Sequence, residues 1–333
     1  MTPSRTLAKT ALAGTAAAAA TAIMIAFGGA AMAAAPPPAA RVTTAASGVP
    51  LNCAASPHSC GYPDATNTGV QPGQVLTAVP AQRTSGPGWA WSRSYGAVMV
   101  TGNGATLAGL AITGSLDIRA SGVTIDNVQV VASGNGWGIG LMHASGTLIE
   151  HSQVYSPPGA DRLQMAIKDV YGDSAGTTIE TSNVWDTDTA IMISAGTVAG
   201  NYVHGLEADP GDHVNGIVSD AGVAAGLTIT GNTVFNPVSQ TDDIALFEDF
   251  GQQLNATITG NLLSGGGYEV YGGANPGKWT PTGITITGNR FARTYYPNGG
   301  SYGPAAAVAT TGHNGNTWTG NIWDNTGNPV TVS

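Results

Sequence analysis

A short pattern recurs through the second half of the chain and limits what the chain can fold into. The segment LTITGN at residues 227–232 returns as ATITGN ending at Asn261, as ITITGN ending at Asn289 and as TWTGN ending at Asn321. Successive copies are 28 to 32 residues apart. A repeat of this length is typical of a solenoid, in which each copy packs only on its neighbours.

Two columns of apolar residues extend the pattern towards the N-terminus. Alignment on the isoleucine of TITGN gives the first column, and the second follows five residues later. The first is Ile125, Ile149, Ile179, Val198, Ile229, Ile258, Ile286 and Trp318, and the second is Val130, Val154, Val184, Val203, Val234, Leu263, Phe291 and Trp323. An odd offset reverses the side-chain direction along a straight strand, so we expect a bend between the columns. Gly-Asn pairs, which tolerate left-handed backbone angles, lie at that point.

A further strand recurs between these pairs of columns. Its apolar markers are Ile139, Ile167, Ile191, Ile217, Ile244 and Val270, separated by 24 to 28 residues. Each coil therefore carries at least two short strands. The low charge of 9% and the 48 glycines also favour short strands and turns over long helices. We predict an all-β solenoid of about eight to ten coils.

The N-terminal residues have the composition of an export signal. Arg5 and Lys9 precede an Ala-rich apolar run that ends in the small-x-small pattern at residues 31–33. We predict a signal peptide over residues 1–35 and a secreted protein without a membrane segment after cleavage; an uncleaved anchor is the alternative. Residues 36–62 form a linker and N-terminal segment, in which we expect Cys53 and Cys60 to form a disulfide rather than a zinc site.

The repeat and its turns resemble the right-handed parallel β-helix proteins of the pectate-lyase-like superfamily. The resemblance covers roughly residues 63–333, and the column Asn201, Asn232, Asn261, Asn289 and Asn321 resembles that family's asparagine ladder. The segments GYPDATNTGV (residues 61–70) and VTGNGATLAGLAITG (residues 100–114) are similar to the opening coils of secreted actinobacterial β-helix proteins. The resemblance implies a single-stranded right-handed β-helix domain at residues 63–333. It implies no single activity, because lyases, hydrolases and adhesins share this fold.

Charged residues gather beside the marker strand in four consecutive coils. They are Arg162, Lys168, Asp186, Asp188, Asp212, His213, Asp242 and Asp243, with Gln240 beside them. Stacking brings matching positions of neighbouring coils to about 4.8 Å, so we expect one charged edge. We predict catalytic roles for Lys168, His213, Asp212, Asp242 and Asp243, and substrate binding by Arg162 and Gln240. Solvated turn residues are the alternative.

Two further patterns concern ligands. Asp186, Asp188, Glu248 and Asp249 are candidate oxygen ligands for Ca2+, although no 12-residue calcium loop is present. Tyr155, Trp185, His204 and Phe235 follow the second column in four adjacent coils. We predict that Tyr155, Trp185 and Phe235 bind sugar rings, with a hydrophobic strip covered by loops as the alternative.

The charge balance selects among partners. Without Arg5 and Lys9, 9 basic residues stand against 20 acidic ones. Nucleic acids and anionic membranes are therefore poor partners, and we expect a monomer that meets an extracellular polysaccharide. Three functions stay open. We place β-elimination first, with Lys168 or His213 as base and Arg162 or Ca2+ neutralising the substrate. Hydrolysis by paired Asp residues and non-catalytic glycan binding are the alternatives.

Overall fold

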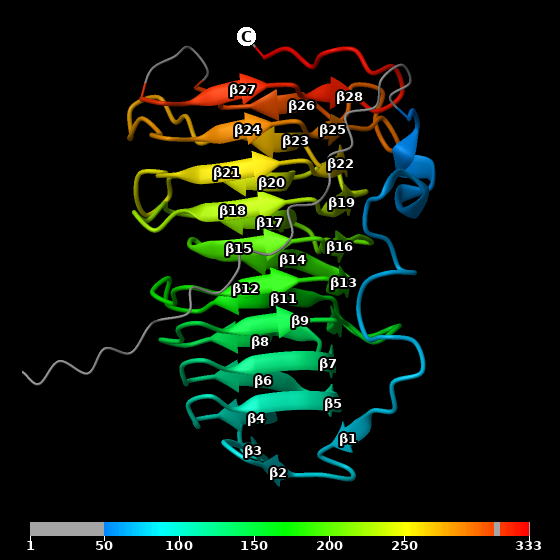
Figure 1. Cartoon of the computed structure of the whole chain (residues 1–333), viewed down its shortest axis with the longest axis vertical. Helices are drawn as coiled ribbons and strands as arrows, with labels where there is room; N and C mark the ends of the chain where they lie inside the picture. Colours follow the sequence, from blue (N-terminus) through cyan, green and yellow to red (C-terminus); the bar gives the residue numbers. More distant parts are fainter. Residues whose placement is uncertain (1–49, 310–313, 333) are drawn as a thin grey trace, which may run out of the picture. The chain divides into compact units, whose positions relative to one another are not determined.

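The computed structural model describes residues 50–309 and 314–332, which form an almost all-β fold. The predicted signal peptide lies outside the described residues. The strands belong to two sheets, sheet A with 17 strands and sheet B with 11. The chain passes from a strand of sheet B to one or two strands of sheet A and back, so each circuit lies on the one before (Figure 1).

The strand bounds follow this alternation. Sheet B contains β2 (Ser85–Gly86), β3 (Trp89–Ser92), β4 (Ala97–Val100), β6 (Ser115–Ile118), β8 (Gly134–Leu141), β11 (Leu163–Asp169), β14 (Thr187–Met192), β17 (Asn215–Ser219), β20 (Asp242–Leu246), β23 (Tyr268–Tyr271) and β26 (Gly303–Ala306). Sheet A contains β1 (Thr77–Val79), β5 (Thr106–Thr113), β7 (Thr124–Val131), β9 (Leu148–Glu150), β10 (Gln153–Tyr155), β12 (Thr178–Glu180), β13 (Asn183–Trp185), β15 (Gly196–Ala199), β16 (Tyr202–Val203), β18 (Leu227–Thr230), β19 (Thr233–Asn236), β21 (Ala256–Thr259), β22 (Leu262–Gly265), β24 (Thr285–Thr287), β25 (Arg290–Phe291), β27 (Thr317–Thr319) and β28 (Ile322–Trp323).

Parallel pairing dominates both sheets. From β4 to β26 each strand of sheet B pairs in parallel with the next, whereas β2 and β3 add antiparallel strands at the N-terminal end. Parallel neighbours need a crossover, and here the crossover is the stretch of chain that runs through sheet A. The arrangement is consistent with a parallel β-helix. The strands β4, β6, β8, β11, β14, β17, β20, β23 and β26 mark nine coils, within the predicted range.

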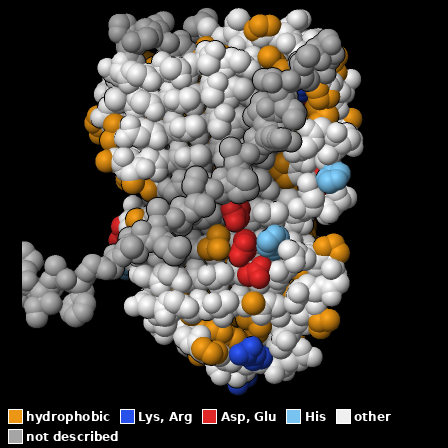
Figure 2. All heavy atoms as spheres, viewed as in Figure 1, with side chains coloured by type: hydrophobic (Ala, Val, Ile, Leu, Met, Phe, Trp, Pro, Cys, Tyr) orange, Lys and Arg blue, Asp and Glu red, His pale blue; other side chains and the backbone are white. Residues whose placement is uncertain are grey.

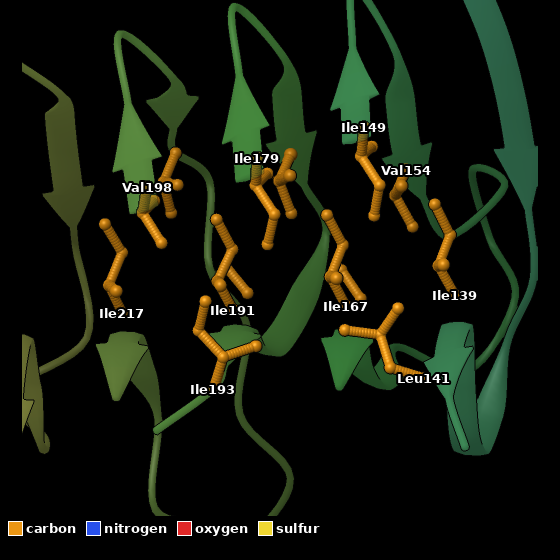
Figure 3. Close-up of a cluster of buried hydrophobic side chains, with 14 of the residues drawn as sticks. Ile139, Leu141, Ile149, Val154, Ile167, Ile179, Ile191, Ile193, Val198 and Ile217 are labelled. Atoms are coloured by element: carbon orange, nitrogen blue, oxygen red, sulfur yellow. The ribbon is translucent and has the colours of Figure 1, made fainter. Parts of the chain in front are cut away.

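The predicted columns are confirmed by the strand register. In the first column, Ile229 lies opposite Ile258 and Ile258 opposite Ile286. The second column and the marker column are also in register along their full predicted lengths. Figure 3 shows the stacked isoleucines and valines filling the space between the sheets. Burying each such side chain stabilises the fold by roughly 1.5–3 kcal/mol.

The predicted bend and asparagine ladder are also confirmed. The glycines of the Gly-Asn pairs have φ between 63° and 65°, which lets the chain turn between the two columns. Asn232 donates from its backbone N–H (2.9 Å) and from Nδ2 (3.0 Å) to Oδ1 of Asn261 in the next coil. Asn261 donates in the same way to Oδ1 of Asn289, from its backbone N–H (3.0 Å) and from Nδ2 (2.9 Å). Ser182 and Ser152 continue the ladder in earlier coils with shorter side chains.

The N-terminal segment is fixed against the last coils. Cys53 and Cys60 form the predicted disulfide, which links the 3-10 turns η1 (Cys53–Ala55) and η2 (Pro57–Cys60). Cys53 packs on Phe235 and Leu262, and its N–H donates to the carboxylate of Asp324 (3.1 Å). This contact covers part of the outer surface of sheet A.

Candidate functional site

The outer face of sheet B carries two rows of side chains that are set by the register. One row contains Trp137, Met165, Thr189, Asn215, Asp242 and Tyr268, and the other contains Lys168, Met192, Val218, Ala245 and Tyr271. The marker isoleucines between the rows point into the core. Side chains from different coils therefore lie on one face although they are up to 134 positions apart in sequence, as Trp137 and Tyr271 are.

A groove crosses these rows between β11 and β23, with a volume of about 660 Å³. Its lining is Gln164, Met165, Asp188, Thr189, Met192, Gly211, Asp212, His213, Asn215, Val218, Asp220, Thr241, Phe247, Asp249 and Tyr271. The only ionisable side chains among them besides His213 and Tyr271 are aspartates. Cationic or uncharged ligands therefore suit this groove better than anionic ones.

Arg162 contacts three aspartates on the acidic side of the groove. Its Nε donates to Asp212 Oδ2 (2.7 Å), and its Nη2 lies 2.6 Å from the same oxygen. Nη2 is also 3.7 Å from Asp188 Oδ2 and 3.5 Å from Asp209 Oδ2. The Arg162 side chain is only 6% exposed. A buried guanidinium shared by three carboxylates is neutralised within the protein, so it holds the carboxylates in place and has little charge left for a substrate.

The two best-placed carboxyls have opposite pKa shifts. Burial raises the pKa of Asp188 to about 7, and the nearby Asp212 carboxylate adds to the effect while Arg162 and the Thr189 hydroxyl oppose it. Partial burial alone would raise the pKa of Asp212 as well. Hydrogen bonds from the Asp209 N–H and from Arg162 outweigh burial, so the pKa of Asp212 lies below its ordinary value. Near neutral pH, Asp188 can therefore hold a proton beside an ionised Asp212.

Asp242 lies in the same outward row but is fully buried. Neither of its carboxylate oxygens has a hydrogen-bond partner among the described residues. Burial, followed by the charge of Asp220, raises its pKa well above the ordinary value. Its neighbours Thr241 and Tyr271 line the groove, so the Asp242 carboxyl lies just beneath the floor, where burial favours its protonated form.

Asp243 is placed on the other side of the strand. It is fully buried, and its Oδ1 accepts the N–H of Asn236 (3.2 Å), a residue of β19 in sheet A. Burial and then the charge of Asp242 raise its pKa well above the ordinary value. Asp243 therefore lies between the sheets and outside the groove lining. Gln240 is nearer the groove, because its Nε2 donates to the Asp212 carbonyl (2.5 Å).

Lys168 faces a separate hollow of about 400 Å³, next to Asp169, Tyr171, Met192 and Asp220. Among the described residues no carboxylate lies within ion-pair distance of Lys168, so neither Asp169 nor Asp173 pairs with it. Asp220 lines both this hollow and the groove. The structure thus separates Lys168 from His213, Asp188 and Asp212, which share the groove.

The predicted aromatic ladder forms on sheet A, and its rings stack on one another. Tyr155 and Trp185 are 4.1 Å apart at 11°, and Trp185 continues onto His204 at 5.8 Å. Burial lowers the pKa of His204 to about 4. Phe235 is only 6% exposed beneath the disulfide segment. The faces that a sugar would need are largely occupied by neighbouring rings.

The candidate calcium ligands are dispersed. Asp186 lies in a turn with φ of 51°. Glu248 is buried and accepts the N–H groups of Gln253 (3.3 Å) and Trp279 (3.2 Å), while Asp249 pairs with Lys278 (3.3 Å). Within residues 50–309 and 314–332, no group of three or more His, Cys, Asp or Glu side chains is arranged to hold a metal ion.

Several groove residues were missed from the sequence. Asp220, Phe247 and Tyr271 lie one to three positions after their markers, where Lys168 was the one residue predicted from the sequence. A second acidic row was also missed on sheet A, where Asp126, Glu150 and Glu180 are register neighbours. Figure 2 shows a face on which most side chains are uncharged and a few acidic ones gather beside a histidine.

No family model matches the chain, and no curated protein matches its sequence. No helix within the described part of the chain is long and apolar enough to span a membrane. Function is therefore inferred from the chemistry of the groove.

Proposed function

We propose that the chain is a secreted glycoside hydrolase that cleaves an extracellular polysaccharide in the groove of sheet B. The coils would form a single-stranded right-handed parallel β-helix, as the sequence resemblance implies. The observation that carries the proposal is the pair Asp188 and Asp212, which comes from adjacent coils and shares Arg162 in an open groove.

In this mechanism Asp188 is the general acid and Asp212 the nucleophile. The protonated Asp188 would give its proton to the glycosidic oxygen. Burial raises the pKa of this carboxyl to about 7, so a large share of it is protonated near neutral pH. The ionised Asp212 would attack the anomeric carbon with Oδ1, since its Oδ2 already accepts hydrogen bonds from Arg162 and from the Asp209 N–H. Water would then release the sugar, activated by the deprotonated Asp188.

The two carboxyls lie closer together than those of inverting glycosidases. Oδ2 of Asp188 and Oδ2 of Asp212 lie 3.7 and 2.6 Å from Arg162 Nη2, so they are at most 6.3 Å apart. The two side chains also hydrogen-bond each other, with Asp188 as the protonated partner. Retaining glycosidases place their carboxyls about 5–5.5 Å apart, and inverting ones about 6.5–9.5 Å. Asp242, two strands away, is too distant and too buried for the same step.

Elimination, our first hypothesis from the sequence, fits the groove less well. A lyase needs a cation that neutralises the uronate carboxylate, and Arg162 already contacts three aspartates. Lys168, one of the two candidate bases, faces the separate hollow. We therefore place hydrolysis of a glycan without carboxylates ahead of elimination.

The test is turnover of a panel of neutral, aminated and uronic polysaccharides by the parent, Asp188→Asn and Asp212→Asn. We expect new reducing ends without an unsaturated product, lost by about 10³-fold or more in each variant. The matched control is Asp161→Asn, an exposed aspartate near the same coil, which should keep full activity. NMR of the first product should show the anomeric configuration of the substrate. An ultraviolet-absorbing product, or full activity in both groove variants, would overturn the proposal.

A further inference from the structure

A second hollow lies beside the groove of sheet B, nearer the N-terminal end of the sheet. Its volume is about 650 Å³, and three of its lining residues are Trp91, Tyr95 and Trp137. The remaining lining residues are glycine, alanine, valine, serine, threonine, asparagine and proline, so no charged side chain lines it. Aromatic walls with a few hydroxyl and amide groups are typical of sites for small polar ligands with apolar faces.

The two indole rings are held in fixed positions by their surroundings. Trp137 Nε1 donates to Asp117 Oδ1 (2.9 Å), and the ring lies over Gly140, where a Cβ atom would come within 2.5 Å of Nε1. The Trp91 ring lies over Gly114, where a Cβ atom would be 2.9 Å from Cη2. A glycine under each ring lets it lie close to the backbone, and both rings line the hollow.

The three aromatic rings of the hollow do not stack on one another. Among the described residues, no ring contact joins Trp91, Tyr95 and Trp137, whereas Tyr155 and Trp185 on sheet A stack at 4.1 Å. Tyr95 is 71% exposed. The hollow therefore offers free aromatic surface, which the ladder on sheet A does not.

The hollow continues into the acidic groove. Trp137 lies opposite Met165, and Met165 opposite Thr189, and both Met165 and Thr189 line the groove. Asn135, which lines the hollow, accepts a hydrogen bond from Nη1 of Arg162 (3.1 Å). Two strand spacings separate Trp137 from Thr189, or about 10 Å, the length of about two sugar units.

We propose that Trp91, Tyr95 and Trp137 form a binding subsite for uncharged pyranose units of the glycan that is cleaved between Asp188 and Asp212. The inference rests on the proposed function and adds the substrate class: an extended, neutral glycan that reaches about two units beyond the point of cleavage. The carbon-bound hydrogens of the sugar face would pack on the rings, and Asn135 and the hydroxyl groups would meet the sugar hydroxyls.

The first experiment measures binding alone. Tryptophan fluorescence of Asp188→Asn is titrated with neutral oligosaccharides of two and of six units, with Tyr95→Ala or Trp137→Phe added. We expect the six-unit Kd to rise about 10-fold or more in each added variant, and Tyr302→Ala, equally 71% exposed in the wild-type chain, to leave it unchanged. Because no charge lines the hollow, the loss should be the same in low and in high salt. A Kd for the six-unit glycan that neither Tyr95→Ala nor Trp137→Phe changes would overturn the subsite.

The second experiment separates the subsite from the proposed function. In the otherwise wild-type chain, Tyr95→Ala should raise KM for long substrates and leave turnover of two-unit substrates unchanged. Hydrolysis that is the same for long and short substrates in Tyr95→Ala and in the parent would remove the subsite and keep the hydrolase. Binding that depends on Tyr95 without any cleavage would keep the subsite and remove the hydrolase. A parent that neither binds nor cleaves any glycan of the panel would overturn both.

Discussion

Two stacks inside the same coils show opposite ways of burying polar side chains. The asparagine ladder repeats one residue from coil to coil, and every amide is satisfied: Asn261 accepts from Asn232 and donates to Asn289 Oδ1 (2.9 Å) and to the Ile229 carbonyl (3.0 Å). In the carboxyl stack of Asp243 and Glu269, each side chain has one oxygen without a hydrogen-bond partner among the described residues, and the adjacent Asp242 has none on either oxygen.

The difference follows from donors and acceptors. An amide carries both, so identical side chains can bond to one another in an endless row. An ionised carboxylate only accepts, so stacked carboxyls stay together only if they keep protons. Burial raises the pKa values of Asp243 and Glu269 well above their ordinary range, and the charge of the neighbouring acid adds to this in each case. The ladder stabilises the fold at any pH, whereas the carboxyl stack makes stability depend on pH.

The largest loss of unfolding free energy should come from placing an acid in the apolar core, where neither the asparagine ladder nor the carboxyl stack is present. Ile258 is fully buried between Ile229 and Ile286. Ile258→Asp should lower the free energy of unfolding by about 4 kcal/mol or more, because the carboxyl meets only apolar layers. Ile258→Val, the control, should lower it by about 1 kcal/mol. Denaturant unfolding measures both, and an aspartate variant as stable as the parent would mean that Ile258 is not in the core.

Breaking the ladder should have the next largest effect. Asn261→Ala removes four hydrogen bonds and leaves the Ile229 carbonyl and the amides of Asn232 and Asn289 incompletely paired. We expect a loss of about 3 kcal/mol in unfolding free energy. Ser182→Ala, in the short-chain part of the ladder, should cost about half as much, and the exposed Asn298→Ala almost nothing. Equal losses for Asn261 and Asn298 would show that the ladder contributes no stability.

The carboxyl stack should reveal itself through pH. A group whose pKa is higher in the folded than in the unfolded protein binds its proton more tightly when folded, so its contribution is complete below the unfolded value and declines as pH rises. Stability should therefore fall above pH ~4, by up to about 1.4 kcal/mol per pH unit for each such acid. Asp243→Asn, which cannot ionise, should unfold like the parent at pH 4 and be more stable than the parent at pH 8. A parent with the same unfolding free energy at both pH values would contradict the raised pKa values.

The position of Asp243 could have been recognised in the sequence. The residue before each marker is Gly138, Ala166, Ala190 and Gly216 in four successive coils, and then Asp243 and Glu269. A Cβ atom on Gly216 would lie 2.4 Å from Val234 Cγ1, which shows that this position points into the core together with the marker. Strict alternation along the strand would have placed it outside. The small residues were the signal that alternation fails at this point.

Five features could be predicted from the amino-acid sequence alone: the coil repeat, the three apolar columns, the Gly-Asn bend, the asparagine ladder and the Cys53–Cys60 pair. Each of these repeats a residue type with the coil, because stacked coils impose the same burial on the same position, or depends on local spacing alone. The contacts between outward side chains depend on the folded structure. Asp188 and Asp212 share Arg162, and Lys168 faces another hollow. Tyr155 stacks on Trp185, whereas Trp137 lines an open hollow. Outward positions carry no packing constraint that repeats from coil to coil. Their contacts therefore depend on loop conformations and rotamers, which aligned sequence positions do not predict.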